Sequence, residues 1–109
     1  GGRAVADMTA WPPERLRALD RAVAEARGWR PDVGYCTPDG KASWLAPVSL
    51  GCRETFDMQA EEKIEVCFHP SYDDWWAQRR MDEDGHCGPT PPIAICLAYL
   101  ASKGRVFNG

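Results

Sequence analysis

The stretch TPPIAICLAYLA, residues 90–101, predicts a buried helix and decides the fold. Thr90 is placed to cap the start of this helix, and Pro91 suits the first helical position, where no backbone N–H is needed. Apolar residues recur at spacings of three and four, which places them on one face of the helix. That face consists of Ile93, Cys96, Leu97 and Leu100. Gly104 marks the far end, so we expect a helix over residues 91–103.

A second helix is predicted near the N-terminal end, over residues 12–27. Pro12 and Pro13 open it, and proline is tolerated in the first turn of a helix. An apolar stripe with helical spacing follows, made of Leu16, Leu19 and Val23. Gly28 supplies the stop signal.

Between the two helices the sequence indicates strands. Residues 35–45 contain a Pro-Asp-Gly turn and predict a hairpin. Residues 64–68 alternate between apolar and polar, which predicts a half-buried strand. Its inward side chains are expected to be Ile64, Val66 and Phe68. After a turn at residues 69–74, we expect a returning strand over residues 75–81. Residues 52–63 fit either a short helix or a loop, and the sequence leaves this choice open.

Length and composition predict one α+β domain. A chain of 109 residues is expected to form a single domain. Its 44% of hydrophobic residues and 27% of charged residues are typical of globular proteins and argue against disorder. Residues 1–7 are interpreted as a tag or a disordered segment, with residues 8–109 as the domain. The predicted fold is an antiparallel β-sheet flanked by helices, an α/β/α sandwich.

The net charge and the hydropathy of the chain argue against two classes of function, nucleic-acid binding and membrane spanning. The net charge of −3 argues against binding to a nucleic-acid backbone, which needs clustered Lys and Arg. No apolar run approaches the roughly 20 residues of a membrane-spanning helix. The five cysteines are an odd number, and no export signal is visible. These features predict a reduced cytoplasmic protein. The sequence gives no reason to expect a cofactor.

Three stretches of the chain carry a family resemblance. They are Arg-Gly-Trp at residues 27–29, Tyr-Asp-Asp-Trp-Trp at residues 72–76 and PPIAICLA at residues 91–98. In this order they resemble the phage ABA sandwich domain family, which groups small phage and prophage proteins. The resemblance covers about residues 11–104 and is closest in the two helices. It implies a phage-derived α/β/α sandwich with an accessory role, and it transfers no catalytic residue.

Two cysteines and two histidines are the candidates for chemistry. Cys67 and His69 lie two residues apart on a predicted strand and share one face, whereas His86 and Cys87 are adjacent in a predicted loop. Two thiolates and two imidazoles suit a tetrahedral zinc ion, and with Asp84 as the orienting acid they suit a Cys–His nucleophile. The spacing departs from that of structural zinc sites. The alternative interpretation is a partly buried Cys67, a solvent-facing His69 and ordinary loop residues at 86–87.

The densest cluster of aromatic and basic residues follows the predicted turn. It comprises Tyr72, Trp75, Trp76, Arg79 and Arg80. Adjacent strand residues point to opposite faces, so both tryptophans are buried only if helices cover both faces of the sheet. Otherwise one ring is exposed beside arginine, which is the composition of a protein-binding hot spot. Stacking on single-stranded nucleic acid is the third interpretation, and the negative net charge disfavours it.

These observations predict a small non-enzymatic accessory protein of a phage or prophage that binds a host or phage protein. Inhibition of a host defence system is one role of this kind, and it follows from the genomic setting that the resemblance implies. The alternative function is a small zinc-binding or Cys/His catalytic domain.

Overall fold

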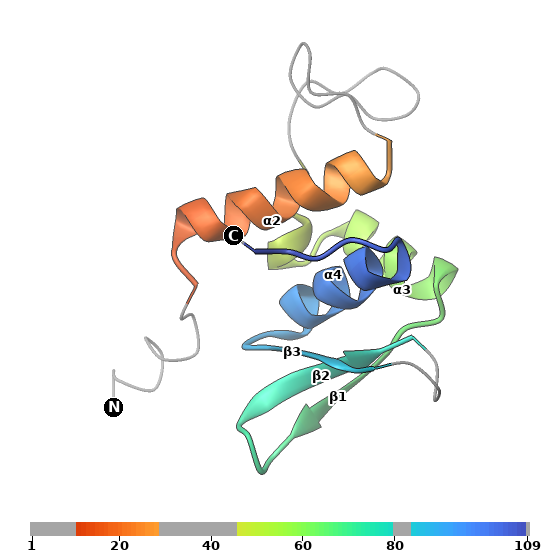
Figure 1. Cartoon of the computed structure of the whole chain (residues 1–109). Helices are drawn as coiled ribbons and strands as arrows, with labels where there is room; N and C mark the ends of the chain where they lie inside the picture. Colours follow the sequence, from red (N-terminus) through yellow and green to blue (C-terminus); the bar gives the residue numbers. More distant parts are fainter. Residues whose placement is uncertain (1–10, 29–45, 80–83, 109) are drawn as a thin grey trace.

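A computed structural model describes residues 11–28, 46–79 and 84–108 of the chain (Figure 1). The elements in chain order are α2 (Pro13–Ala26), the 3-10 helix η1 (Val48–Leu50), α3 (Arg53–Glu61), β1 (Glu65–His69), β2 (Asp74–Gln78), β3 (His86–Gly88) and α4 (Pro91–Ser102). Three strands form one antiparallel sheet, α4 packs against the sheet, and the other helices pack on α4. The predicted α+β fold class is therefore confirmed. The predicted hairpin at residues 35–45 lies outside the described residues.

The ends of α2 and α4 follow the local signals in the sequence. The Thr90 side-chain oxygen accepts a hydrogen bond from the Ile93 backbone N–H at 3.4 Å, which caps α4. Beyond the two helices, Gly28 and Gly104 adopt φ angles of 84° and 72°, the left-handed region that glycine enters without strain. Both predicted helices are confirmed, and each of their ends lies within one residue of its expected place.

The sheet runs in the order β1-β2-β3. Its register places Cys67 opposite Trp76 and Trp76 opposite Cys87. The two predicted strands are confirmed, although the second ends at Gln78 rather than at residue 81. The third strand, β3, occupies a stretch for which the sequence predicted a loop. Three residues are too few to show an alternating pattern, so β3 is defined by its pairing with β2 and by no local signal.

α4 is the central layer of the molecule. Figure 1 shows the sheet on one side of α4 and α2 on the other, and α4 contacts all six other described elements. Because layers pack on opposite sides, α4 is buried nearly all round. Its buried residues are Ile93, Ala94, Ile95, Cys96, Ala98, Tyr99 and Leu100. The predicted single apolar stripe is therefore too narrow, and one of its members, Leu97, is only partly buried.

The stretch that the sequence left open forms the helix α3. The Cys52 backbone N–H donates to the Thr55 hydroxyl oxygen at 3.1 Å, and this hydroxyl donates to the Val48 carbonyl at 2.7 Å. Thr55 is fully buried, so these bonds tie the start of α3 to η1. The N-cap position is held by cysteine, which is not among the residues preferred there. This explains why the sequence did not indicate a helix start.

Phe68 differs from its predicted inward position. It is 43% exposed, although by strand alternation it lies on the same side of the sheet as the half-buried Val66. α4 lies mainly over β2 and β3, so the outer strand β1 is covered less. The Phe68 ring instead packs edge-on against Trp75, with the ring centroids 5.4 Å apart. An apolar side chain therefore remains open at the margin of the sheet.

Candidate partner-binding site

The structure separates the four residues of the Cys/His set. Cys67 and Cys87 flank Trp76 on the outer face of the sheet, which is the face turned away from α4. His86, which lies on β3 rather than in a loop, is opposite Ala77. Ala77 is buried on the α4 side, so the two cysteines and His86 lie on opposite faces. The described ranges contain no group of three or more His, Cys, Asp or Glu residues placed to hold a metal. The four predicted ligands do not converge on one ion.

His69 shares the outer face with Cys67, as the sequence predicted, but it is partly buried rather than fully solvent-facing. The centroid of the imidazole ring lies 4.7 Å from that of Tyr72 and 6.0 Å from that of Trp76. The Nδ1 atom of His69 is buried and has no hydrogen-bond partner among the described residues. The ring is thus part of an aromatic cluster on the outer face of the sheet.

The surroundings of three thiols disfavour nucleophilic attack. Burial raises the pKa of Cys87, and the negative charge of Asp74 raises it further. Burial also raises the pKa of Cys52, and it raises that of Cys96, which lies inside the core, well above its ordinary value. A raised pKa lowers the fraction of thiolate, which is the reactive form. None of these three cysteines has the electropositive surroundings of a catalytic nucleophile.

The predicted aromatic and basic cluster is divided between the two faces of the sheet. Trp75 lies on the α4 side and packs against the core. Trp76 lies on the outer face, where the Gly85 backbone packs so closely on the indole that a Cβ at Gly85 would overlap the ring. Tyr72 is 68% exposed and therefore remains accessible to a partner. Arg80 lies outside the described residues.

Arg79 belongs to an ion-pair network rather than to an open surface. Its Nη1 atom lies 3.7 Å from Oε1 of Glu62, and the Nζ atom of Lys103 lies 3.0 Å from Oε2 of the same carboxylate. These three residues follow directly after β2, α3 and α4. Glu62 therefore links the ends of three elements, and a charge reversal at Arg79 would disturb their packing.

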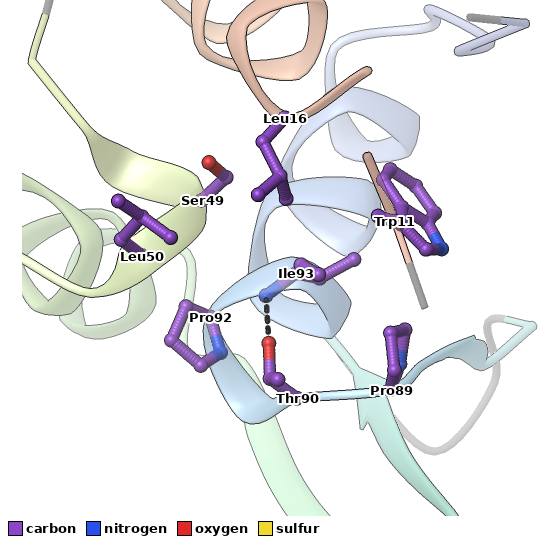
Figure 2. Close-up of a pocket in the computed structure, with 8 residues that line it drawn as sticks. All are labelled: Trp11, Leu16, Ser49, Leu50, Pro89, Thr90, Pro92 and Ile93. Atoms are coloured by element: carbon purple, nitrogen blue, oxygen red, sulfur yellow. Dashed lines mark hydrogen bonds between the residues drawn. The ribbon is translucent and has the colours of Figure 1, made fainter. Parts of the chain in front are cut away.

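An apolar pocket lies at the N-terminal end of α4 (Figure 2). Its walls come from the start of α2, from η1 and from the loop that enters α4. The lining residues are Trp11, Leu16, Ser49, Leu50, Pro89, Thr90, Pro92 and Ile93. The cavity volume is about 180 Å³. Leu50 is 68% exposed, so the apolar surface continues from the pocket onto the outside of the molecule.

The backbone at the pocket floor offers few hydrogen-bond donors. Pro91 and Pro92 have no N–H group, and the N–H of Ile93 is already bonded to the Thr90 side chain. The usual ability of a helix start to bind anions is therefore blocked at α4. The N–H of Ser49, on the pocket wall, donates to the Asp20 carboxylate at 2.8 Å. The pocket is suited to an apolar group.

A positive charge stands beside this pocket. The Arg15 guanidinium lies 3.7 Å from the centre of the Trp11 ring. Trp11 also stacks against Phe107, with the ring centroids 5.8 Å apart. The Nε atom of Arg15 is buried and has no hydrogen-bond partner among the described residues. Arg15 therefore places a cation over Trp11, one of the residues that line the apolar cavity.

Sequence reasoning missed this pocket. Trp11 precedes the first helix, Leu50 ends an unpredicted 3-10 helix, and Pro92 belongs to the closing helix, so no local pattern connects them. A pair of signals was nevertheless present, because Trp11 and Arg15 are four residues apart at a helix start and Leu50 is an apolar residue next to Gly51. Only the packing of α2 and η1 on α4 brings these residues together.

Comparisons with known proteins give no relative of this chain. No family model matches it, and neither the curated proteins nor the solved structures yield a match. The resemblance to the phage ABA sandwich domain family therefore stays a prediction. Among the helices of the described ranges, none combines the length and the apolar character that a membrane crossing requires.

Proposed function

We propose that this chain is a small non-enzymatic accessory protein of a phage or prophage and that it acts by binding another protein. The observation that carries the binding function is the apolar pocket beside Arg15. Its volume of about 180 Å³ is below the roughly 300–1,000 Å³ of pockets that hold small molecules or cofactors. A cavity of this size accommodates one apolar side chain, and side chains seated in such pockets dominate the affinity of protein interfaces.

The chemistry around the pocket defines the partner further. An apolar anchor would fill the cavity and cover the exposed Leu50. A carboxylate next to that anchor would meet the guanidinium of Arg15, which lies over the Trp11 ring in the pocket wall. The partner segment is therefore apolar with an adjacent acidic residue. Inhibition of a host defence system is one role that such binding would serve, and the family resemblance supports the phage setting.

The proposal is tested by affinity capture from a bacterial host lysate with three baits. These are the wild type, Leu50→Asp at the pocket and Tyr72→Ala on the outer face of the sheet. Both substituted residues are 68% exposed, so both variants should fold normally. Placing a charge at the mouth of an apolar pocket should weaken binding about 30-fold, the effect of losing roughly 2 kcal/mol at a hot spot.

The outcomes separate two surfaces. We expect wild type and Tyr72→Ala to capture a protein that Leu50→Asp does not capture. Loss in Tyr72→Ala alone would move the contact to the cluster that the sequence singled out. Equal capture of every protein by all three baits would contradict both surfaces. With a captured protein in hand, Arg15→Glu should weaken the complex most at low salt, where charge attraction is least screened.

A further inference from the structure

The outer edge of β1 is unpaired in the described part of the chain. β1 is the first strand in the order β1-β2-β3, so only one of its edges is bonded within the sheet. The other edge presents backbone N–H and C=O groups that can pair with a further strand. Three residues of this edge strand are exposed, namely Glu65, Cys67 and Phe68. Glu65 is charged and Pro70 follows the strand, but its middle, at Cys67 and Phe68, carries neither of these features that usually protect an edge.

The sequence of β1 is complementary to itself when it is reversed. In an antiparallel pair centred on Cys67, Val66 lies opposite Phe68 of the partner subunit, on the α4 side of the sheet. On the outer face, Glu65 lies opposite His69 of the partner subunit, which brings an acid to a base. Cys67 lies opposite Cys67 of the partner subunit, on the two-fold axis. Every cross-strand pair thus joins side chains of compatible chemistry.

Two neighbouring registers are less favourable. Centring the pair between Val66 and Cys67 would place Glu65 opposite Phe68 of the partner subunit, which sets a charge against an apolar ring. Centring it on Val66 would place Lys63 opposite His69 of the partner subunit, which sets two basic groups together. Pro70 ends the pairing in the favoured register because proline has no N–H to donate.

We propose that β1 pairs with β1 of a second copy of this chain and that the two sheets join into one of six strands. A hydrogen bond from the His69 imidazole to the Glu65 carboxylate favours this register, and the exposed Phe68 gains an apolar neighbour across the interface. The space for a second copy exists because α4 lies mainly over β2 and β3. The central helices of the two copies are then held apart by both β1 strands. This inference is independent of the pocket at the start of α4.

Sedimentation velocity over a range of protein concentrations, under reducing conditions, tests the proposal. Wild type should show a concentration-dependent equilibrium between monomer and dimer. Phe68→Asp should raise the dimer dissociation constant by roughly tenfold or more, because the pair occurs twice across the axis. Val106→Asp is the matched control, since Val106 is an exposed apolar residue outside the sheet. Thermal melts of both variants, and of the milder Phe68→Ala, show that any loss of dimer is not a loss of folding.

Oxidation by diamide locates the interface. Two Cys67 thiols on the axis should form one disulfide, giving up two protons and two electrons that convert diamide to its hydrazine. We expect a covalent dimer in wild type and in Cys87→Ser, and none in Cys67→Ser. Cys87 is the matched control because it is exposed on the same face but lies on the opposite edge strand. A monomer at every concentration, or a cross-link that requires Cys87 instead, would overturn the proposal.

Discussion

Asp20 connects α2 to η1 across a long stretch of sequence. Its carboxylate is 1% exposed and accepts hydrogen bonds from the Ser49 N–H at 2.8 Å and from the Arg17 guanidinium at 2.9 Å. A buried carboxylate is tolerated only when it is bonded and neutralised in this way. From the sequence, Arg17 and Asp20 look like an ordinary exposed pair one helical turn apart. Their structural role depends on Ser49, which no local pattern places beside them.

We therefore expect Asp20→Ala to lower the free energy of unfolding by about 3 kcal/mol, because the Ser49 N–H would be left buried without an acceptor. Asp20→Asn retains one acceptor oxygen and should cost clearly less. Asp57→Ala is the control, since Asp57 is exposed on α3. Urea denaturation of the three variants measures these differences. Equal stability of Asp20→Ala and Asp57→Ala would show that the hydrogen bond to Ser49 contributes nothing.

At the scale of the elements, the sequence was most informative where a helix-capping residue or a repeating apolar pattern lies within a few residues. Thr90 with Pro91, and Gly28 after the first apolar stripe, define helix ends through local chemistry. β3 forms by pairing with a distant segment, so the sequence predicted a loop there. The exposure of Phe68 on β1 also depends on how distant segments pack, so the sequence wrongly predicted that Phe68 points inward. The pocket lies beyond local patterns for the same reason.

The position of α4 between two layers changes which of its residues matters most. Ile95 is fully buried, whereas Leu97, which the sequence placed in the core stripe, is only partly buried. Ile95→Ala should lower the free energy of unfolding by about 2–5 kcal/mol, and Leu97→Ala by distinctly less. Both substitutions leave alanine in a helix, so helix propensity affects them similarly. Thermal or urea unfolding of the two variants gives the comparison, and a greater loss in Leu97→Ala would contradict the layer order.

At the scale of the whole molecule, the fold class was predictable and the order of the layers was not. The spacing of apolar residues distinguishes helices from strands, and the order of these elements along the chain predicts an α+β domain. α4 lies between the sheet and α2 because it contacts both, and the stacking of Trp11 on Phe107 joins the two ends of the described chain. No period in the sequence encodes such a contact.

The network around Glu62 offers a test of how the layers are joined. A double-mutant cycle with Arg79→Ala and Glu62→Ala should give a coupling energy of about 0.2–1 kcal/mol, the range of partly exposed ion pairs. Arg79→Glu should destabilise the domain more than Arg79→Ala does, because it places two carboxylates together beside Lys103. Unfolding in low and in high salt measures both effects. A coupling energy of zero that salt does not change would show that the network is not formed in solution.

The central position of α4 also has a consequence for folding during synthesis on the ribosome. The ribosome releases a chain from its N-terminal end, so α2, η1, α3 and all three strands emerge before the helix on which they pack. Until residues 91–102 have left the ribosome, the apolar surfaces that these elements turn toward α4 are uncovered. Such incomplete chains expose the surfaces that chaperones bind and that aggregate when crowded. The domain should therefore fold late in its synthesis, and its yield in a cell should depend on the chaperones that meet the nascent chain.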